Sequence, residues 1–307
     1  MIDAAQLTGV MCATVTPMAE DGFSVCWDGV RSNAEWLMSQ PISVVVVNGS
    51  IGEYAFLSSA DRSRAVRETV EAVAGRALVV AGCSSDSPTT VVQLSREAAE
   101  NGADAIMLLP PHYFRLSPQS IEQFFRYVDE NTSLPFIVYN NPSITGFDLT
   151  MGTVAVIADM PRFLAYKEAS PQPLRYFEIA RRLSGRPVIP ASESVLFFCL
   201  ASGASACMTS VAAFAPSLLA RMLDAFATGD VDGARTEFAR LHAYRSLLQP
   251  DLDRGLPAYI AYTKAAMNIL GLTGGRPHFP LPPLDEEGTE ALRKVLTEQM
   301  GLSPIDG

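Results

Sequence analysis

The sequence predicts an α/β fold in which eight parallel strands, each followed by a helix, close into a (β/α)8 barrel that carries a helical appendage. Three observations support this prediction. Short β-branched runs alternate with longer helical patterns over the first 226 residues. The candidate strands are apolar almost throughout, as strands covered on both faces are, and they lack the alternation of an antiparallel sheet. The length of 307 residues suits such a barrel, which takes about 250 residues, with room for an extra segment.

The strands and the first helices can be assigned in order along the chain. The predicted strands are Val10–Thr16, Ile42–Val47, Ala77–Ala81, Ala105–Leu109, Pro135–Tyr139, Phe163–Lys167, Pro187–Ile189 and Ala206–Thr209. A helix is predicted over Asp61–Ala74, where Gly75 ends the pattern, and Ser-Pro pairs at 87–88 and 117–118 begin two more. Strand–helix–strand units of this rhythm imply right-handed parallel crossovers, and eight of them form a TIM barrel.

The strand patterns stop at about Ala227. Helical patterns then cover Val231–Leu248, Pro257–Leu270 and Asp285–Met300. We therefore expect two parts, a barrel catalytic domain over 1–226 and a C-terminal helical region over 227–307 that packs on it.

Composition excludes several classes of function. The net charge of −10, without a basic cluster, argues against binding of nucleic acid. The chain has no apolar run of 18 residues and no basic N-terminal cluster before an apolar stretch, so neither membrane insertion nor secretion is expected. Its five cysteines form no CxxC pair, which argues against a zinc or redox site and is typical of a reducing cytoplasm. We expect a cytoplasmic protein without a metal.

Two reactive side chains stand at the ends of neighbouring predicted strands. Tyr139 ends the fifth strand and Lys167 ends the sixth. The ends of parallel barrel strands meet at one mouth, where barrel enzymes carry their active sites. A lysine held among apolar strand ends loses hydration of its cationic form, so its pKa falls toward about 7 to 8 and the neutral amine becomes a nucleophile. The pair predicts imine chemistry on a ketone.

Three loops complete the predicted mouth. Asn48–Glu53 follows the second strand, and its backbone amides either bind an anion or form an ordinary turn. Ala191–Ser194 and Met208–Ser210 follow the seventh and eighth strands and are expected to contact the distal half of a substrate. Glu193 is either a ligand for substrate hydroxyls or a helix-start carboxylate. Glu168, beside the lysine, is interpreted as a capping or solvated charge.

Several segments resemble the signatures of a known superfamily. These are GSIGE at 49–53, YNNPSITG at 139–146, YKEAS at 166–170, TVTPM at 14–18, PPHYF at 110–114 and the segment 264–272. In order and spacing they are similar to the motifs of the dihydrodipicolinate synthase/N-acetylneuraminate lyase superfamily. The resemblance covers nearly the whole chain.

The resemblance implies a class I, metal-independent lyase that needs no cofactor. Lys167 would form a Schiff base with pyruvate or a longer 2-oxo acid, and Tyr139 would be the general acid and base. Ser50, with the amides of Ser50 and Ile51, would hold the 2-oxo acid's carboxylate and link Tyr139 to Tyr113. The family residue matching Tyr113 is commonly lent by a neighbouring subunit, which implies a homotetramer built as a dimer of dimers. The other predicted substrate-binding residues are Gly49, Ile144, Thr145, Ala191, Glu193 and Met208.

Departures from the family pattern bear on the substrate. Dihydrodipicolinate synthases resemble one another in placing arginine at the position of Ile144, where it meets the second substrate's carboxylate, and they usually have two adjacent threonines where this chain has Ser50 and Ile51. An apolar side chain cannot replace a guanidinium, so aldol cleavage or dehydration of a sugar-acid-like 2-oxo acid is favoured.

Three other functions are alternatives to cleavage or dehydration of a 2-oxo acid. Condensation of pyruvate with aspartate semialdehyde and non-catalytic binding of a 2-oxo acid stay open. A barrel that acts on phosphate esters is disfavoured, because the loops at 191–194 and 208–210 contain no glycine.

Overall fold

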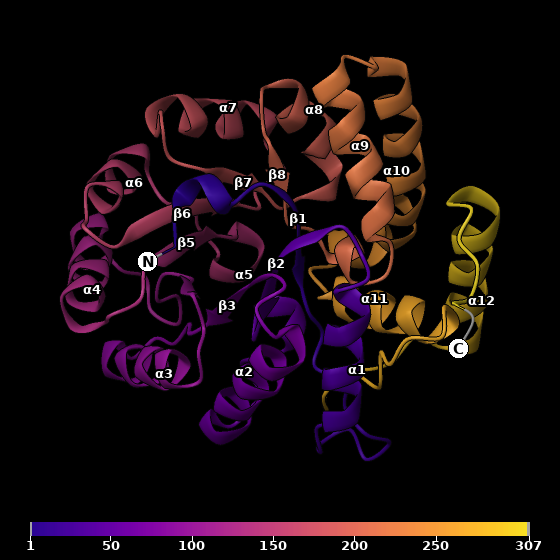
Figure 1. Cartoon of the computed structure of the whole chain (residues 1–307), viewed down its shortest axis with the longest axis horizontal. Helices are drawn as coiled ribbons and strands as arrows, with labels where there is room; N and C mark the ends of the chain where they lie inside the picture. Colours follow the sequence, from indigo (N-terminus) through magenta and orange to yellow (C-terminus); the bar gives the residue numbers. More distant parts are fainter. Residues whose placement is uncertain (1, 306–307) are drawn as a thin grey trace.

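The computed structural model describes residues 2–305 and contains the predicted TIM barrel (Figure 1). Its strands are β1 (Gly9–Ala13), β2 (Ile42–Val47), β3 (Leu78–Gly82), β4 (Ala105–Leu108), β5 (Phe136–Asn140), β6 (Phe163–Glu168), β7 (Val188–Pro190) and β8 (Ala206–Cys207). They form one sheet in the order β7-β6-β5-β4-β3-β2-β1-β8, and the paired strands are parallel. The Met208 amide donates to the Pro190 carbonyl at 3.0 Å, which brings β8 back to β7 and closes the barrel.

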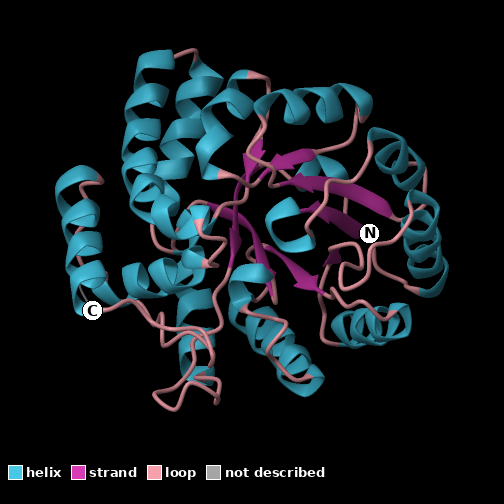
Figure 2. Cartoon of the chain, turned by 180° about the vertical axis from the view of Figure 1, so that it is seen from behind, coloured by secondary structure: helices cyan, strands magenta, loops and turns pink. Residues whose placement is uncertain are grey.

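Helices surround the strands, and Figure 2 shows them as an outer ring. The α-helices are α1 (Trp27–Leu37), α2 (Ser59–Val73), α3 (Pro88–Glu100), α4 (Pro118–Asn131), α5 (Pro142–Thr145), α6 (Met151–Ala158), α7 (Pro173–Arg182), α8 (Leu196–Ala201), α9 (Pro216–Thr228), α10 (Val231–Asp253), α11 (Ala258–Ile269) and α12 (Glu286–Lys294). Short 3₁₀ segments are η1 (Ala4–Gln6), η2 (Ser50–Gly52), η3 (Glu193–Val195) and η4 (Ser210–Ala213), and η5 (Val295–Gln299) is a π-helical turn. Within residues 2–305, no helix is both long and apolar enough to cross a membrane.

The two helix starts predicted at Ser-Pro pairs are confirmed, whereas α2 begins at Ser59, two residues before the predicted start at Asp61. The hydroxyls of Ser58, Ser87 and Ser117 each accept a hydrogen bond from the backbone amide three residues on, which satisfies a donor that the first turn leaves free. In α3 and α4 proline follows the cap, where its missing N–H and fixed φ suit the first turn. The first predicted strand is shorter than expected and ends at Ala13.

The helical appendage follows the predicted pattern with different limits. α9 passes through the predicted boundary between residues 226 and 227, so the division into 1–226 and 227–307 remains a prediction. α10 continues past the predicted end at Leu248 to Asp253, with Pro250 in its last turn. Figure 1 shows α10 beside α9, with α11 and α12 farther along the same side of the barrel.

A buried ion pair between Lys264 and Glu53 joins the appendage to the barrel. The Lys264 side chain, 1% exposed, forms an ion pair with Glu53 and also donates to the carbonyls of Thr16 (2.6 Å) and Arg276 (2.7 Å). The other Glu53 oxygen accepts from the His278 amide at 2.6 Å. Burial lowers the pKa of Lys264, and Glu53 opposes that shift. One ammonium therefore ties α11 to the segments that follow β1 and β2.

Loss of this ammonium is expected to destabilise the whole protein. Lys264→Met leaves the Glu53 carboxylate buried without its cation, which costs about 3 to 5 kcal/mol of unfolding free energy. Urea denaturation followed by circular dichroism measures the change. Lys294→Met, at an exposed lysine on α12, is the control and should stay within about 0.5 kcal/mol of the wild type. Equal unfolding midpoints for the two variants would contradict the role given to the ion pair.

Candidate active site

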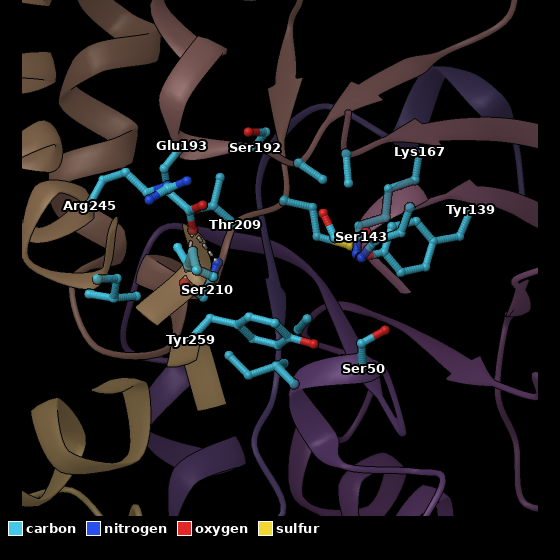
Figure 3. Close-up of a pocket in the computed structure, with 18 of the residues that line it drawn as sticks. Ser50, Tyr139, Ser143, Lys167, Ser192, Glu193, Thr209, Ser210, Arg245 and Tyr259 are labelled. Atoms are coloured by element: carbon cyan, nitrogen blue, oxygen red, sulfur yellow. Dashed lines mark hydrogen bonds between the residues drawn. The ribbon is translucent and has the colours of Figure 1, made fainter. Parts of the chain in front are cut away.

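Lys167 and Tyr139 lie side by side at the mouth of the barrel, as predicted. They are register partners on β6 and β5, so their side chains leave the two strands on the same face. The Lys167 Nζ lies 3.8 Å from the centroid of the Tyr139 ring. Both side chains are buried, with 5% of Lys167 and 6% of Tyr139 exposed. The amine is thus held over the aromatic ring and away from bulk water (Figure 3).

Burial gives this amine and this phenol different protonation states at neutral pH. It lowers the pKa of Lys167 to about 7, and the charge of Glu193 acts in the opposite direction. Burial raises the pKa of Tyr139 to about 12, partly offset by a hydrogen bond from Asn141 Nδ2 to the phenol oxygen at 2.8 Å. Near pH 7 a large share of Lys167 is a neutral nucleophile, whereas Tyr139 keeps its proton and can donate it.

Imine formation should therefore follow the titration of Lys167. Below pH 7 the amine is protonated, so the rate of adduct formation at low pyruvate concentration should fall about tenfold per pH unit; above about pH 8 it should level off. Rapid mixing with pyruvate between pH 5.5 and 10, followed by acid quenching and mass spectrometry, measures this rate. A rate that continues to rise to pH 10 would show a lysine of ordinary pKa and would contradict the assignment.

The turn after β2 supplies donors on one side of the cavity. Ser50 and Ile51 are the first residues of η2, so their backbone amides have no acceptor within that turn. The Ser50 Oγ is buried and, within residues 2–305, has no hydrogen-bond partner. Thr209 Oγ1, which lines the same cavity, is also buried without a partner among those residues. Buried polar groups are normally satisfied, so both hydroxyls are available to a ligand.

The loops after β7 and β8 form the wall opposite this turn. Glu193 Oε1 accepts hydrogen bonds from the amide (3.0 Å) and the hydroxyl (2.8 Å) of Ser210. These bonds link the two loops and fix the carboxylate at the edge of the cavity, where its second oxygen has no hydrogen-bond partner among residues 2–305. The cavity between this wall and the β2 turn has a volume of about 150 Å³.

The structure brings together most of the residues predicted to form the site. Those that line the cavity are Lys167, Tyr139, Ser50, Ile51, Ala191, Glu193 and Met208. Gly49 precedes η2 and is not part of the lining. Their roles in catalysis and binding remain predictions.

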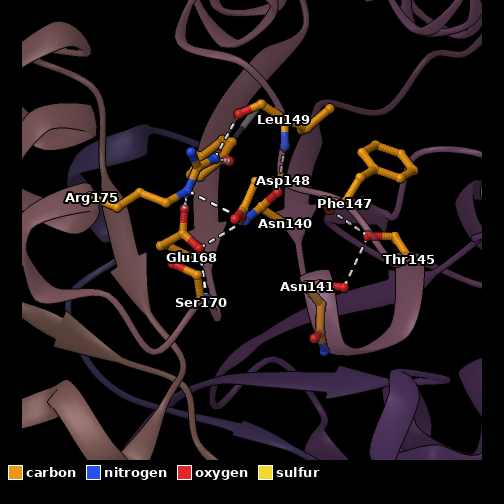
Figure 4. Close-up of polar contacts among 10 residues, drawn as sticks. Asn140, Asn141, Thr145, Phe147, Asp148, Leu149, Glu168, Ser170 and Arg175 are labelled. Carbon is orange, nitrogen blue, oxygen red and sulfur yellow. Dashed lines mark hydrogen bonds and ion pairs between the residues drawn. The ribbon is translucent and has the colours of Figure 1, made fainter. Parts of the chain in front are cut away.

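Three other predicted site residues lie outside the cavity of this chain. Ile144 is half-buried in α5 and packs against the hydrophobic core. Thr145 Oγ1 donates to the carbonyls of Asn141 (3.1 Å) and Phe147 (2.8 Å), so it holds the chain around α5 in place (Figure 4). Tyr113 is 79% exposed on the loop after β4, with its ring edge-to-face with that of Phe114. A catalytic role for Tyr113 therefore requires the cavity of another subunit.

The interpretation of Glu168 as a capping or solvated charge is wrong. Its side chain is 2% exposed and pairs with Arg175 Nε at 3.0 Å, while Asn140 Nδ2 donates to its other oxygen at 2.8 Å. Arg175 and Asn140 both contact Asp148 as well, at 3.2 and 2.7 Å (Figure 4). Asn140 and Glu168 directly follow the site tyrosine and lysine along their strands, so this network fixes β5 and β6 behind them.

The appendage contributes cavity residues that sequence reasoning missed. Tyr244, Arg245, Leu248 and Leu252 come from α10, and Tyr259 comes from α11. The helical patterns predict that these helices pack on the barrel, but no local signal says which side of α10 faces its mouth. The cavity is also lined by Asn141 and Ser143, from the motif at 139–146, and by Ala169, from the motif at 166–170.

Comparison with known proteins agrees with this fold and identifies its family. A profile of the dihydrodipicolinate synthetase family matches residues 6–299. The chain is 32% identical over 297 residues to a 4-hydroxy-tetrahydrodipicolinate synthase of Methanothrix thermoacetophila (96% of this chain, 98% of the relative), and 30% identical over 298 residues to that of Gluconacetobacter diazotrophicus (96% and 98%). It is also similar to the crystal structure of a chloride-inhibited dihydrodipicolinate synthase from Acinetobacter baumannii complexed with pyruvate, with a TM-score of 0.87, 27% identity and coverage of 96% and 99%. The chain therefore belongs to the dihydrodipicolinate synthetase family, as its motifs predict.

Proposed function

We propose that this protein is a class I lyase that forms an imine between Lys167 and pyruvate or a longer 2-oxo acid resembling the 2-oxo-3-deoxy sugar acids. The observation that carries the proposal is the buried Lys167 amine, with a pKa of about 7, above the ring of Tyr139. A neutral amine beside a protonated phenol is what attack on a ketone requires.

The proposed reaction begins with attack of Lys167 Nζ on the keto carbon. The phenol of Tyr139 protonates the carbonyl oxygen to give a carbinolamine, and the phenolate takes back the proton that the attacking nitrogen loses. The same phenol then protonates the hydroxyl, which leaves as water when the protonated imine forms, and the phenolate that remains takes up a proton in a later step. Ser50 Oγ and the amides of Ser50 and Ile51 hold the substrate carboxylate. The protonated imine draws electrons from the adjacent carbon, so cleavage of a carbon–carbon or carbon–oxygen bond needs no metal and no organic cofactor.

We further propose a cytoplasmic homotetramer built as a dimer of dimers. The proposal of an oligomer is supported by Tyr113 and Phe114, which expose two adjacent aromatic rings and do not line this chain's own cavity. Tyr113 would then enter the site of a neighbouring subunit. The five cysteines are all free thiols, which suits a reducing compartment.

A second candidate is 4-hydroxy-tetrahydrodipicolinate synthase, which condenses pyruvate with aspartate semialdehyde. The similarity of the chain to 4-hydroxy-tetrahydrodipicolinate synthases favours it. The half-buried Ile144 opposes it, because this position lacks the arginine that family members use for the second carboxylate. A barrel that binds a 2-oxo acid without turnover is the remaining alternative.

A substrate panel separates these three activities. Purified protein is assayed with 2-oxo-3-deoxy sugar acids, 4-hydroxy-2-oxoglutarate and N-acetylneuraminate for release of pyruvate or a dehydrated product, and with pyruvate plus aspartate semialdehyde for condensation. Cleavage or dehydration of a 2-oxo acid at least tenfold more efficient than condensation supports the proposal. Faster condensation would contradict the proposal and identify the protein as the synthase. Imine formation without any turnover would contradict it and identify the protein as a barrel that only binds a 2-oxo acid.

A further inference from the structure

A guanidinium stands at the cavity wall that the appendage forms. Arg245 lies on α10, and its side chain lines the cavity together with Leu248 and Leu252. Its Nη1 donates a hydrogen bond to the side-chain oxygen Oε1 of the neutral Gln249 at 2.7 Å. Within residues 2–305, no carboxylate lies close enough to form an ion pair with it, unlike Arg240 on the same helix, which pairs with Glu237. Arg245 therefore forms no ion pair with an acidic side chain in this part of the chain.

This cation lies at the opposite end of the cavity from the predicted imine. In Figure 3 Arg245 and Glu193 lie on one side, whereas Lys167, Tyr139 and Ser50 lie on the other. With the first carboxylate of a 2-oxo acid at Ser50 and its second carbon at Lys167, the rest of the carbon chain extends toward Glu193 and Arg245. The far end of the substrate then faces the guanidinium.

Within residues 2–305, the Glu193 carboxylate forms no ion pair with the Arg245 guanidinium. One of its oxygens is held by two hydrogen bonds from Ser210, which directs the carboxylate to the loop after β8. The leucines of α10 line the cavity beside Arg245, and apolar surroundings strengthen the attraction between a guanidinium and an anion. A planar guanidinium also binds a planar carboxylate through two parallel hydrogen bonds.

We propose that Arg245 binds a second carboxylate at the far end of the substrate, so that the site prefers 2-oxo dicarboxylic acids to 2-oxo monocarboxylic acids. This inference rests on the proposed imine chemistry and narrows its substrate class. Arg245 would supply, from the appendage, the carboxylate-binding cation that is absent at Ile144. A phosphate group is a poorer fit, because the neighbouring loops at 191–194 and 208–210 contain no glycine to form a backbone cradle.

Pairs of 2-oxo acids of equal chain length test the inference without knowledge of the natural substrate. The first pair is 2-oxoglutarate and 2-oxovalerate, and the second pair is 2-oxoadipate and 2-oxohexanoate. In each pair the first acid ends in a carboxylate where the second ends in a methyl group. The concentration that gives half-maximal adduct is measured by borohydride trapping and intact-protein mass spectrometry. In at least one pair the wild type should be half-saturated by the diacid at an about 10- to 100-fold lower concentration, as expected for a hydrogen-bonded charge pair.

Substitutions on α10 test whether Arg245 is the group that gives the preference for the diacid. Arg245→Met should reduce the diacid preference to about onefold while half-saturation with pyruvate stays within about twofold, which also shows that the variant is folded. Arg245→Lys should keep part of the preference, because an ammonium retains the charge but not the paired hydrogen bonds. Arg235→Met, at an exposed arginine on the same helix, is the matched control and should keep the full preference.

The outcomes separate this inference from the function on which it rests. Adducts with pyruvate, but no diacid preference in either pair, would overturn the distal carboxylate site and leave the lyase intact. A preference that persists in Arg245→Met would overturn the role of Arg245. Absence of a pyruvate adduct in the wild type would overturn the proposed function and the distal site with it.

Discussion

Lys167→Met is expected to abolish imine formation and to reduce turnover by a factor on the order of 10⁴ or more, because the variant lacks the only proposed nucleophile. Methionine has nearly the same length and suits the buried position, so the barrel should stay folded. Activity is measured with the best substrate of the panel, and the adduct by mass spectrometry. Residual activity above about 1% of the wild type would contradict the role of Lys167.

The same variant is expected to be more stable than the wild type at neutral pH. A lysine whose pKa falls from 10.5 to about 7 on folding binds fewer protons in the folded than in the unfolded state. Burial of Lys167 therefore destabilises the fold below pH 10.5, most strongly below pH 7, and this penalty fades as pH rises between those values. Lys167→Met removes it and should gain roughly 2 to 4 kcal/mol at pH 7, since one pKa unit corresponds to about 1.4 kcal/mol. Urea denaturation at pH 7 and pH 9.5 checks both the gain and its decline. A loss of stability at pH 7 would contradict the burial of an uncompensated amine.

Tyr139→Phe is expected to lower turnover by about 10² to 10⁴, because the variant lacks the proton donor but keeps the ring under Lys167. The adduct with pyruvate should still form, but slowly. Steady-state kinetics and the rate of trapping by borohydride separate these effects. Tyr259→Phe removes another phenol that lines the cavity and is the matched control, with activity expected within about tenfold of the wild type.

A Tyr139→Phe variant that turns over within about threefold of the wild type would contradict the assignment of the phenol as the general acid and base. An equal loss in Tyr139→Phe and Tyr259→Phe would instead point to a general effect of cavity polarity.

The barrel and its central pair were predictable because local patterns decide both. Apolar runs of strand length, separated by helices with serine caps, leave few topologies other than a parallel barrel. The ends of parallel strands meet at one mouth, so the positions of Tyr139 and Lys167 on successive strands place them together once the barrel is assumed. The resemblance to the family added a role for Ser50 and Ile51 in the turn after the second strand, which also lies at that mouth.

The remaining features depend on tertiary packing that no local pattern encodes. The burial of Glu168 follows from its pairing with Arg175, seven residues away on α7, which neutralises a charge that would otherwise need water. Which side of α10 faces the cavity depends on how the appendage docks, so Arg245 could not be assigned to the site from its helix pattern. The role of Tyr113 depends on a neighbouring subunit and is not decided by one chain.

Reduction of the protein with borohydride in the presence of pyruvate, followed by peptide mass spectrometry, tests the central claim most directly. The chain contains only three lysines, Lys167, Lys264 and Lys294, so the modified site can be read without ambiguity. Lys264 is engaged in its buried ion pair, and Lys294 is exposed on α12 and does not line the cavity. We expect a single pyruvate adduct on Lys167 that disappears in Lys167→Met. An unmodified Lys167 at saturating pyruvate, or an adduct confined to Lys294, would contradict it.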